Sequence, residues 1–173
     1  KDIKIKNENS ELDLESKSHY VQAKISGEKQ ALSIEDSAIF RLPALVGENM
    51  KSKSILLTFI NNIKEKGSIE LWGNGMREQN FLDVSDAADA FDLILQTKTD
   101  HKIFNIANHQ TITMKKLANI VIILAKAGAI SFKNQQDPNE NLCVKYNVNL
   151  AKKVLKWSAT KPINETIQGI LSL

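Results

Sequence analysis

The chain of 173 residues is 42% hydrophobic and 25% charged, with a formal net charge of +3, a composition typical of a soluble domain that buries a core. This composition excludes a disordered or collagen-like chain, and the single cysteine, Cys143, excludes a disulfide framework and fits a reducing cytosol. No stretch approaches the roughly 18 apolar residues that a membrane helix needs, so we expect a cytoplasmic protein without a membrane partner.

Two further classes of partner are also disfavoured by composition. The cations are almost all dispersed lysines, whereas nucleic-acid binding favours clustered charge and arginine. His19, His101 and His109 have no metal-ligand spacing, and no cysteine cluster is present, so we expect no metal site.

The first part of the chain predicts a loop, a helix and a strand. Residues 1–18 are rich in Lys, Glu, Asn and Ser, which predicts a flexible arm or loop. Ser18 is a good N-cap for a helix over 19–33. The apolar run 38–42, which ends before Pro43, predicts a buried strand. A helix followed by a buried strand indicates an α/β fold.

A second helix and two strands are predicted next. Apolar residues recur at helical spacing over 52–66, and Gly67 provides the C-terminal stop. The short apolar runs 68–72 and 80–84 predict strands on either side of the glycine turn at 73–75.

The remaining elements continue this alternation. Ser85 is the expected N-cap of a helix that ends near Gln96, and Thr113 is the expected N-cap of another helix that follows a buried strand over 103–106. The inner face of the first of these helices is expected to contain Ala87, Ala90, Phe91 and Ile94. Four shorter elements complete the chain: strands over 129–132 and 142–144, and helices over 148–156 and 162–171.

Tyr20 and Lys24 are the strongest candidates for chemistry. Their i, i+4 spacing places both side chains on one face of the first predicted helix. A lysine ammonium can lower the pKa of a phenol toward the range in which tyrosine acts as a general acid or base. In a lysine-rich chain such a pair also arises by chance, and it is then only an exposed helical pair.

Five motifs in a fixed order give this pair its context. They occupy residues 20–28, 40–47, 71–75, 80–90 and 103–107. The ordered series resembles the C-terminal part of the extended short-chain dehydrogenases/reductases (SDR), the NAD-dependent epimerase/dehydratase family, which acts largely on nucleotide sugars. The resemblance runs from about Tyr20 to the end of the chain. It implies an α/β, Rossmann-like fold with parallel strands, covering helices and a small substrate-binding subdomain.

The resemblance also implies roles for single residues. Tyr20 would be the catalytic acid/base, exchanging a proton with a sugar hydroxyl while a hydride passes to or from nicotinamide. Lys24 would hold the nicotinamide ribose and lower the pKa of the tyrosine, so both residues count as catalytic and as cofactor-binding. Pro43 and Leu45 would lie against the nicotinamide, Leu45 through its backbone. The cofactor of the complete protein would be NAD or NADP.

The implied substrate-binding positions depart from the family pattern. They are Ala44, Gly75, Arg77 and Gln79. Many relatives have an Asn in place of Ala44, and an Arg that grips the substrate diphosphate in place of Gln79. Three interpretations stay open: Arg77 and Lys133 substitute for the missing arginines, the substrate is not a typical sugar diphosphate, or Arg77 is an ordinary solvated loop residue.

Four other conspicuous residues are expected to be structural. Trp72 and Trp157 stand beside apolar neighbours and predict core positions. Arg41 is also expected in the core, paired with carbonyl or carboxylate groups. Asp86 is expected to be a first-turn helix acid rather than a catalyst.

The family mechanism needs a glycine-rich nucleotide-binding unit ahead of the tyrosine. The single G-x-G, at Gly73 and Gly75, lacks the third glycine, because position 78 is Glu78. We therefore expect residues 19–173 to be the catalytic-tyrosine and substrate-binding portion of an epimerase, dehydratase or reductase, incomplete without an upstream NAD-binding segment. Alone it is expected to bind no cofactor and to be inactive. The alternative is a non-catalytic ligand-binding or scaffold module. The resemblance also allows a homodimer packed through the helix around 19–33.

Overall fold

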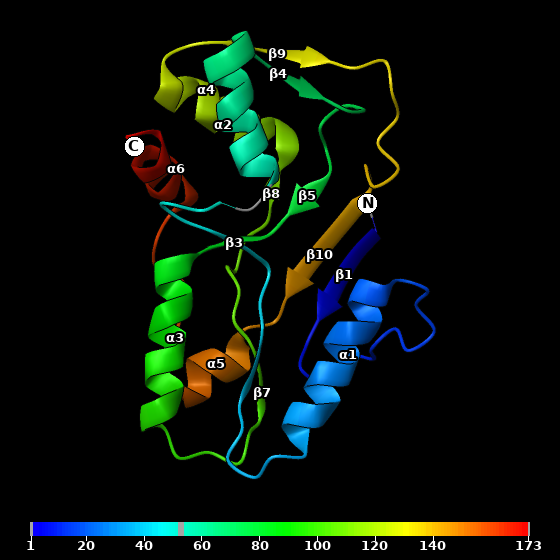
Figure 1. Ribbon diagram of the computed structural model, residues 1–173, viewed down its shortest axis with the longest axis vertical. Helices are drawn as coiled ribbons and strands as arrows, with labels where there is room; N and C mark the ends of the chain where they lie inside the picture. Colours follow the sequence, from blue (N-terminus) through cyan, green and yellow to red (C-terminus); the bar gives the residue numbers. More distant parts are fainter. Residues whose placement is uncertain (1, 52–53, 173) are drawn as a thin grey trace.

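The computed structural model describes residues 2–51 and 54–172, which form an α/β structure as predicted (Figure 1). Lys1, Leu173 and residues 52–53, where the predicted helix over 52–66 begins, lie outside the described residues. No helix within the described ranges is long and apolar enough to cross a bilayer.

Local capping signals fix the ends of several helices. α1 (His19–Leu32) begins after Ser18, whose hydroxyl accepts the backbone N–H of Val21. α2 (Ile55–Lys66) ends at Gly67, which takes the left-handed conformation that favours glycine. α4 (Met114–Ala125) has Thr113 as its N-cap. These predicted boundaries are confirmed.

The predicted N-cap of α3 (Val84–Gln96) is wrong, because Asp83 and not Ser85 caps this helix. Asp83 has extended backbone angles, and its Oδ1 accepts hydrogen bonds from the Ser85 backbone N–H at 2.9 Å and from the Ser85 hydroxyl at 2.6 Å. Ser85 is therefore a donor to the cap. An acidic cap two residues earlier satisfies the first free N–H groups equally well.

The inner face of α3 is only partly as predicted. Ala87 and Ala90 are buried and Ile94 packs against the core, but Phe91 is 51% exposed. The Phe91 ring instead contacts Phe40, with 4.8 Å between the ring centroids. The larger ring lies across the rim of the core rather than inside it.

The strands form pairs between segments far apart in the chain. Four pairs are parallel and one is antiparallel among the described residues. The parallel pairs are β1 (Asp2–Lys6) with β10 (Leu142–Tyr146), β2 (Ile39–Arg41) with β7 (Ile103–Asn105), β3 (Ala44–Val46) with β6 (Phe81–Asp83), and β4 (Ser68–Leu71) with β9 (Ala129–Phe132); β5 (Glu78–Gln79) pairs antiparallel with β8 (Ile112–Thr113). The two strands that flank the 73–75 turn therefore pair with other strands and not with each other.

The prediction of a loop over residues 1–18 is wrong for Asp2–Lys6, which form β1. Five residues of β1 pair with β10 along its whole length, and Ile3 and Ile5 alternate with lysines as they do in an edge strand. Local composition suggested a solvated arm because the strand's partner lies far along the chain.

Two hydrophobic cores lie at opposite ends of the long axis (Figure 1). The first core contains buried side chains of α2, α4 and α6 (Ile163–Leu171), and the second contains those of β7, α3 and α5 (Asn149–Val154). Phe81 packs in the first core and Leu82 in the second, because successive side chains of a strand point in opposite directions. β6 thus joins the two cores.

Three of the four residues expected to be structural are so. Trp157 is buried and donates its indole N–H to the Asp86 carbonyl at 2.9 Å. Arg41 donates to the Glu28 carboxylate, and it also donates to the Glu8 carbonyl at 2.9 Å. The Asp86 carboxylate accepts the hydroxyl and backbone N–H of Thr160 and the N–H of Lys161. The position of Trp72 is described below.

Candidate functional site

A cavity of about 450 Å³ lies where α1, β3, β5 and β10 meet. Five of the predicted site residues line it: Tyr20, Pro43, Ala44, Arg77 and Gln79. They come from three segments of the chain, so only the fold brings them together. Its remaining wall is formed by Leu42, Glu78, Asn80, Asn139, Leu142, Val144 and Tyr146.

Tyr20 lies in the first turn of α1 and is 71% exposed. The Nζ of Lys24 lies 5.5 Å from the centroid of the Tyr20 ring, so the two side chains do share one face of the helix. No side chain of α1 is buried. The phenol and the ammonium are therefore both accessible to a ligand.

The other three predicted site residues, Lys24, Leu45 and Gly75, do not line this cavity. Leu45 follows Ala44 on β3, and strand alternation turns its side chain away from the cavity that Ala44 lines. Both backbone groups of Gly75 are engaged inside the protein: its N–H donates to the Trp72 carbonyl and its carbonyl accepts from Lys115. Gly75 therefore shapes the turn and offers no free backbone group to a substrate.

Arg77 is not a solvated loop residue. Its side chain is 29% exposed, and its Nε lies 3.7 Å from Oδ2 of the buried Asp137. Lys133, the other candidate for binding a diphosphate, lies 3.9 Å from Glu70 and 5.8 Å from the Trp72 ring. Arg77 is thus the cation that faces the cavity around Tyr20.

Tyr146 is a cavity residue that the sequence did not indicate. It is partly buried at the end of β10, and burial raises the pKa of its phenol above the ordinary value. The predicted strand stopped at residue 144, whereas pairing with Lys6 of β1 extends it to Tyr146. The missing signal was therefore the partner strand.

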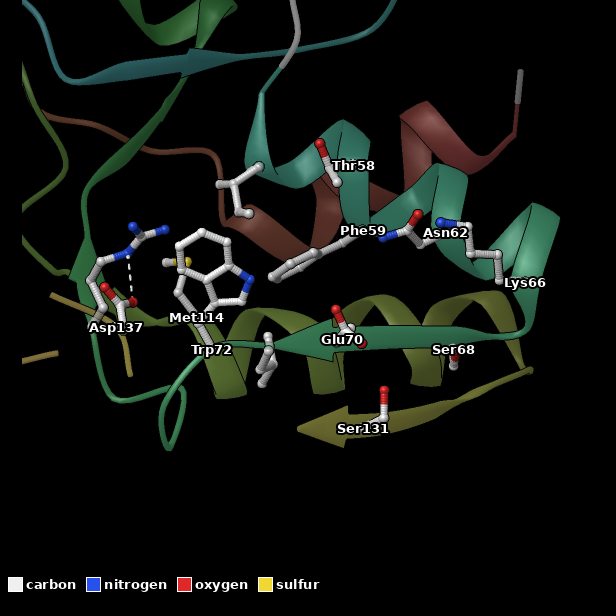
Figure 2. A pocket seen from close by; sticks show the side chains of 13 residues that line it. Thr58, Phe59, Asn62, Lys66, Ser68, Glu70, Trp72, Met114, Ser131 and Asp137 are labelled. Atoms are coloured by element: carbon white, nitrogen blue, oxygen red, sulfur yellow. Dashed lines mark ion pairs between the residues drawn. The ribbon is translucent and has the colours of Figure 1, made fainter. Parts of the chain in front are cut away.

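A second cavity, of about 460 Å³, lies between α2 and β4 (Figure 2). Trp72 and Phe59 lie at its apolar wall, with Asp137 at one end and Lys66 at the other. The prediction that Trp72 is a core residue is wrong, since it is 45% exposed and faces this cavity. Trp72 lies in the exposed turn after β4, where the residues of the first core do not bury it.

The glycine turn after β4 binds an internal carboxylate. Glu140 accepts the backbone N–H groups of Asn74 and Met76, the latter at 2.8 Å. A Cβ added to Gly73 would overlap Glu140. Successive N–H groups of this kind bind anions, and here they bind a side chain of the protein. The turn does not offer these N–H groups to a cofactor phosphate.

Cys143, on β10, is buried and donates to the Glu78 carboxylate at 3.1 Å. Burial raises the pKa of the thiol, and the hydrogen bond to Glu78 raises it further. Both effects favour the protonated thiol, which is a weaker nucleophile than a thiolate. Within residues 2–51 and 54–172, no three His, Cys, Asp or Glu side chains are arranged to hold a metal.

Comparison with known proteins relates this geometry to a family. The model of the NAD dependent epimerase/dehydratase family matches residues 1–107. dTDP-4-dehydro-6-deoxyglucose reductase of Escherichia coli is 23% identical over 154 residues, which cover 88% of this chain and 46% of that protein. The chain thus spans about half the length of this relative.

Solved structures share the fold. UDP-glucuronic acid 4-epimerase from Bacillus cereus, in complex with NAD, matches with a TM-score of 0.82 at 16% identity, covering 99% of this chain and 55% of that one. RMD from Pseudomonas aeruginosa, complexed with NADPH, matches with a TM-score of 0.76 at 16% identity, covering 98% and 64%. At these identities the matches establish the Rossmann-like architecture and no residue role.

Proposed function

This chain belongs to the NAD dependent epimerase/dehydratase family, and we propose that it supplies the catalytic tyrosine and sugar-binding cavity of a nucleotide-sugar epimerase, dehydratase or reductase. The proposal rests on the observation that Tyr20, Pro43, Ala44, Arg77 and Gln79 all line the same cavity. It holds a phenol, an amide and a guanidinium, which are groups that bind sugar hydroxyls and an anion.

The two tyrosines of the cavity have different chemical roles in this proposal. Tyr20 is exposed beside the Lys24 ammonium, and its hydroxyl exchanges a proton with a sugar hydroxyl. Burial raises the pKa of Tyr146 and so favours its neutral phenol, to which we assign the orientation of the sugar by hydrogen bonding. Gln79 adds an uncharged donor and acceptor.

The residues present fit one end of a nicotinamide cofactor. Tyr20 and Lys24 would hold the nicotinamide ribose, and Pro43 would lie against the ring. The cofactor, when bound, accepts or supplies the hydride. The glycine turn does not fit its pyrophosphate, because Glu140 occupies the Asn74 and Met76 N–H groups. We therefore propose that the pyrophosphate is held by a segment outside these residues, and that these residues alone bind no cofactor and are inactive.

The experiment is turnover of a nucleotide sugar by the polypeptide that contains this chain together with an NAD-binding segment. Tyr20→Phe is expected to lower kcat by at least about a hundredfold, because it removes the proton-transferring hydroxyl and little else. Tyr146→Phe is the matched control, because both tyrosines line the same cavity. It is expected to change kcat by less than about tenfold, since it loses one hydrogen bond.

The alternative function is a non-catalytic ligand-binding or scaffold module. It is favoured by Gln79, which has no charge for a diphosphate, and by the engaged glycine turn. A polypeptide that binds a nucleotide sugar but does not turn it over would reject the enzymatic proposal and leave this module, whereas a Tyr20→Phe variant that turns over at the wild-type rate would reject the role given to Tyr20. We also propose, from the exposed face of α1, a homodimer through the helix around 19–33.

A further inference from the structure

Arg77 stands in the wall between the two cavities. It lines the cavity around Tyr20 and also the cavity around Trp72. Asp137 lines the second cavity and Asn139 lines the first, so the segment 133–141 completes the same wall. Arg77 is thus the lining residue that the two cavities share.

Arg77 and Asp137 form an ion pair without a hydrogen bond between them. The distance of 3.7 Å from Nε to Oδ2 is too long for a hydrogen bond. The buried Nε–H of Arg77 has no hydrogen-bond partner among the residues that the structure describes. The Asp137 side chain is only 7% exposed. A guanidinium with an unsatisfied N–H group favours binding of an anion that can accept a hydrogen bond from it.

The segment 133–141 is held in place by contacts that do not involve Arg77. Glu140 accepts the N–H groups of Asn74 and Met76, and the Gly73 N–H donates to the Gln135 carbonyl at 2.8 Å. Because these contacts do not depend on Arg77, we expect Asp137 to stay beside it when another anion approaches. The incoming anion therefore meets both the guanidinium and a carboxylate that repels it.

We propose that Asp137 is the internal counter-ion of Arg77 and sets the affinity of this site for the diphosphate of the substrate. It is a specificity-determining residue, because it weakens binding of any anion that the Arg77 guanidinium does not contact closely. The inference rests on the proposed function, since it assumes that the two cavities together hold one nucleotide sugar.

The test is titration calorimetry of the full chain with inorganic pyrophosphate. Asp137→Asn keeps the size of the side chain and the oxygen that accepts the Asn139 N–H, while it removes the charge. It is expected to tighten pyrophosphate binding about tenfold. Arg77→Gln in the same background is expected to abolish that gain. Asp100→Asn, in the exposed loop between α3 and β7, makes the same change in net charge and is expected to leave binding unchanged (Figure 1).

Equal or weaker binding by Asp137→Asn would overturn the proposal, as would a gain that survives Arg77→Gln or that Asp100→Asn reproduces. If Asp137→Asn does not fold, Asp137→Ser, which also removes the charge, gives the same test. Pyrophosphate has neither sugar nor base, and binding needs no turnover. A failure here is therefore distinct from a failure of the Tyr20 experiment, which measures catalysis.

Discussion

Asp83 connects three parts of the molecule through one buried carboxylate. It caps α3, accepts the Thr166 hydroxyl of α6 at 2.6 Å, and lies 3.2 Å from the Lys161 ammonium. Burial alone would raise the pKa of Asp83, but hydrogen bonds from Ser85 and Thr166 and the contact with Lys161 outweigh it and lower the pKa. The folded state therefore favours the ionised carboxylate.

This lowered pKa predicts a pH dependence of stability. Because the folded pKa lies below the unfolded one, the contribution of Asp83 is fully present above about pH 4 and is lost as the pH falls through the folded pKa. Asp83→Asn is expected to cost about 2 kcal/mol of unfolding free energy at neutral pH. Urea denaturation across this pH range should show the difference from wild type shrinking in acid.

Asp89→Asn, on the exposed side of α3, is the matched control and should leave the pH dependence unchanged. A difference between wild type and Asp83→Asn that is the same at neutral and acid pH would contradict the role given to the Asp83 charge.

Elements with local signals could be predicted from the sequence, whereas strand partners could not. Ser18, Thr113 and Gly67 set helix ends through contacts within one turn, so their neighbours along the chain suffice. β1 depends on β10, and that pairing also carries β10 on to Tyr146. Because β1 and the end of β10 depend on each other, the sequence predicted neither β1 nor the cavity residue Tyr146.

Gly67 and Gly27 differ in backbone conformation, so replacing each by alanine should change the stability of the protein in opposite directions. Gly67 caps α2 at φ +66, so Gly67→Ala is expected to cost about 1 kcal/mol from left-handed strain. Gly27 lies inside α1 with nothing within 4 Å of an added Cβ, so Gly27→Ala is expected to gain about 0.5–1 kcal/mol. Thermal unfolding of both variants measures this, and shifts of the same sign would contradict the helix boundaries.

In the whole molecule, the cavity around Tyr20 lies between segments that neither core contains alone. The resemblance of the five motifs indicated Tyr20, Ala44, Arg77 and Gln79, and the fold places them around one cavity. The sequence did not indicate Asp137, because its link to Arg77 depends on how the segment 133–141 crosses the glycine turn. The motifs could predict residues of the cavity wall, but only the tertiary structure places the Asp137 carboxylate beside the Arg77 guanidinium.

We propose above that the cavity around Tyr20 holds the reacting sugar. The test is a crystal structure of a polypeptide that contains this chain together with an NAD-binding segment, bound to NAD and a nucleotide sugar that it turns over. The measured quantity is the distance from Tyr20 Oη to the nearest sugar hydroxyl. We predict about 2.6–3.2 Å, within hydrogen-bond reach. A sugar bound elsewhere, with Tyr20 Oη facing solvent, would show that this cavity is not the sugar site.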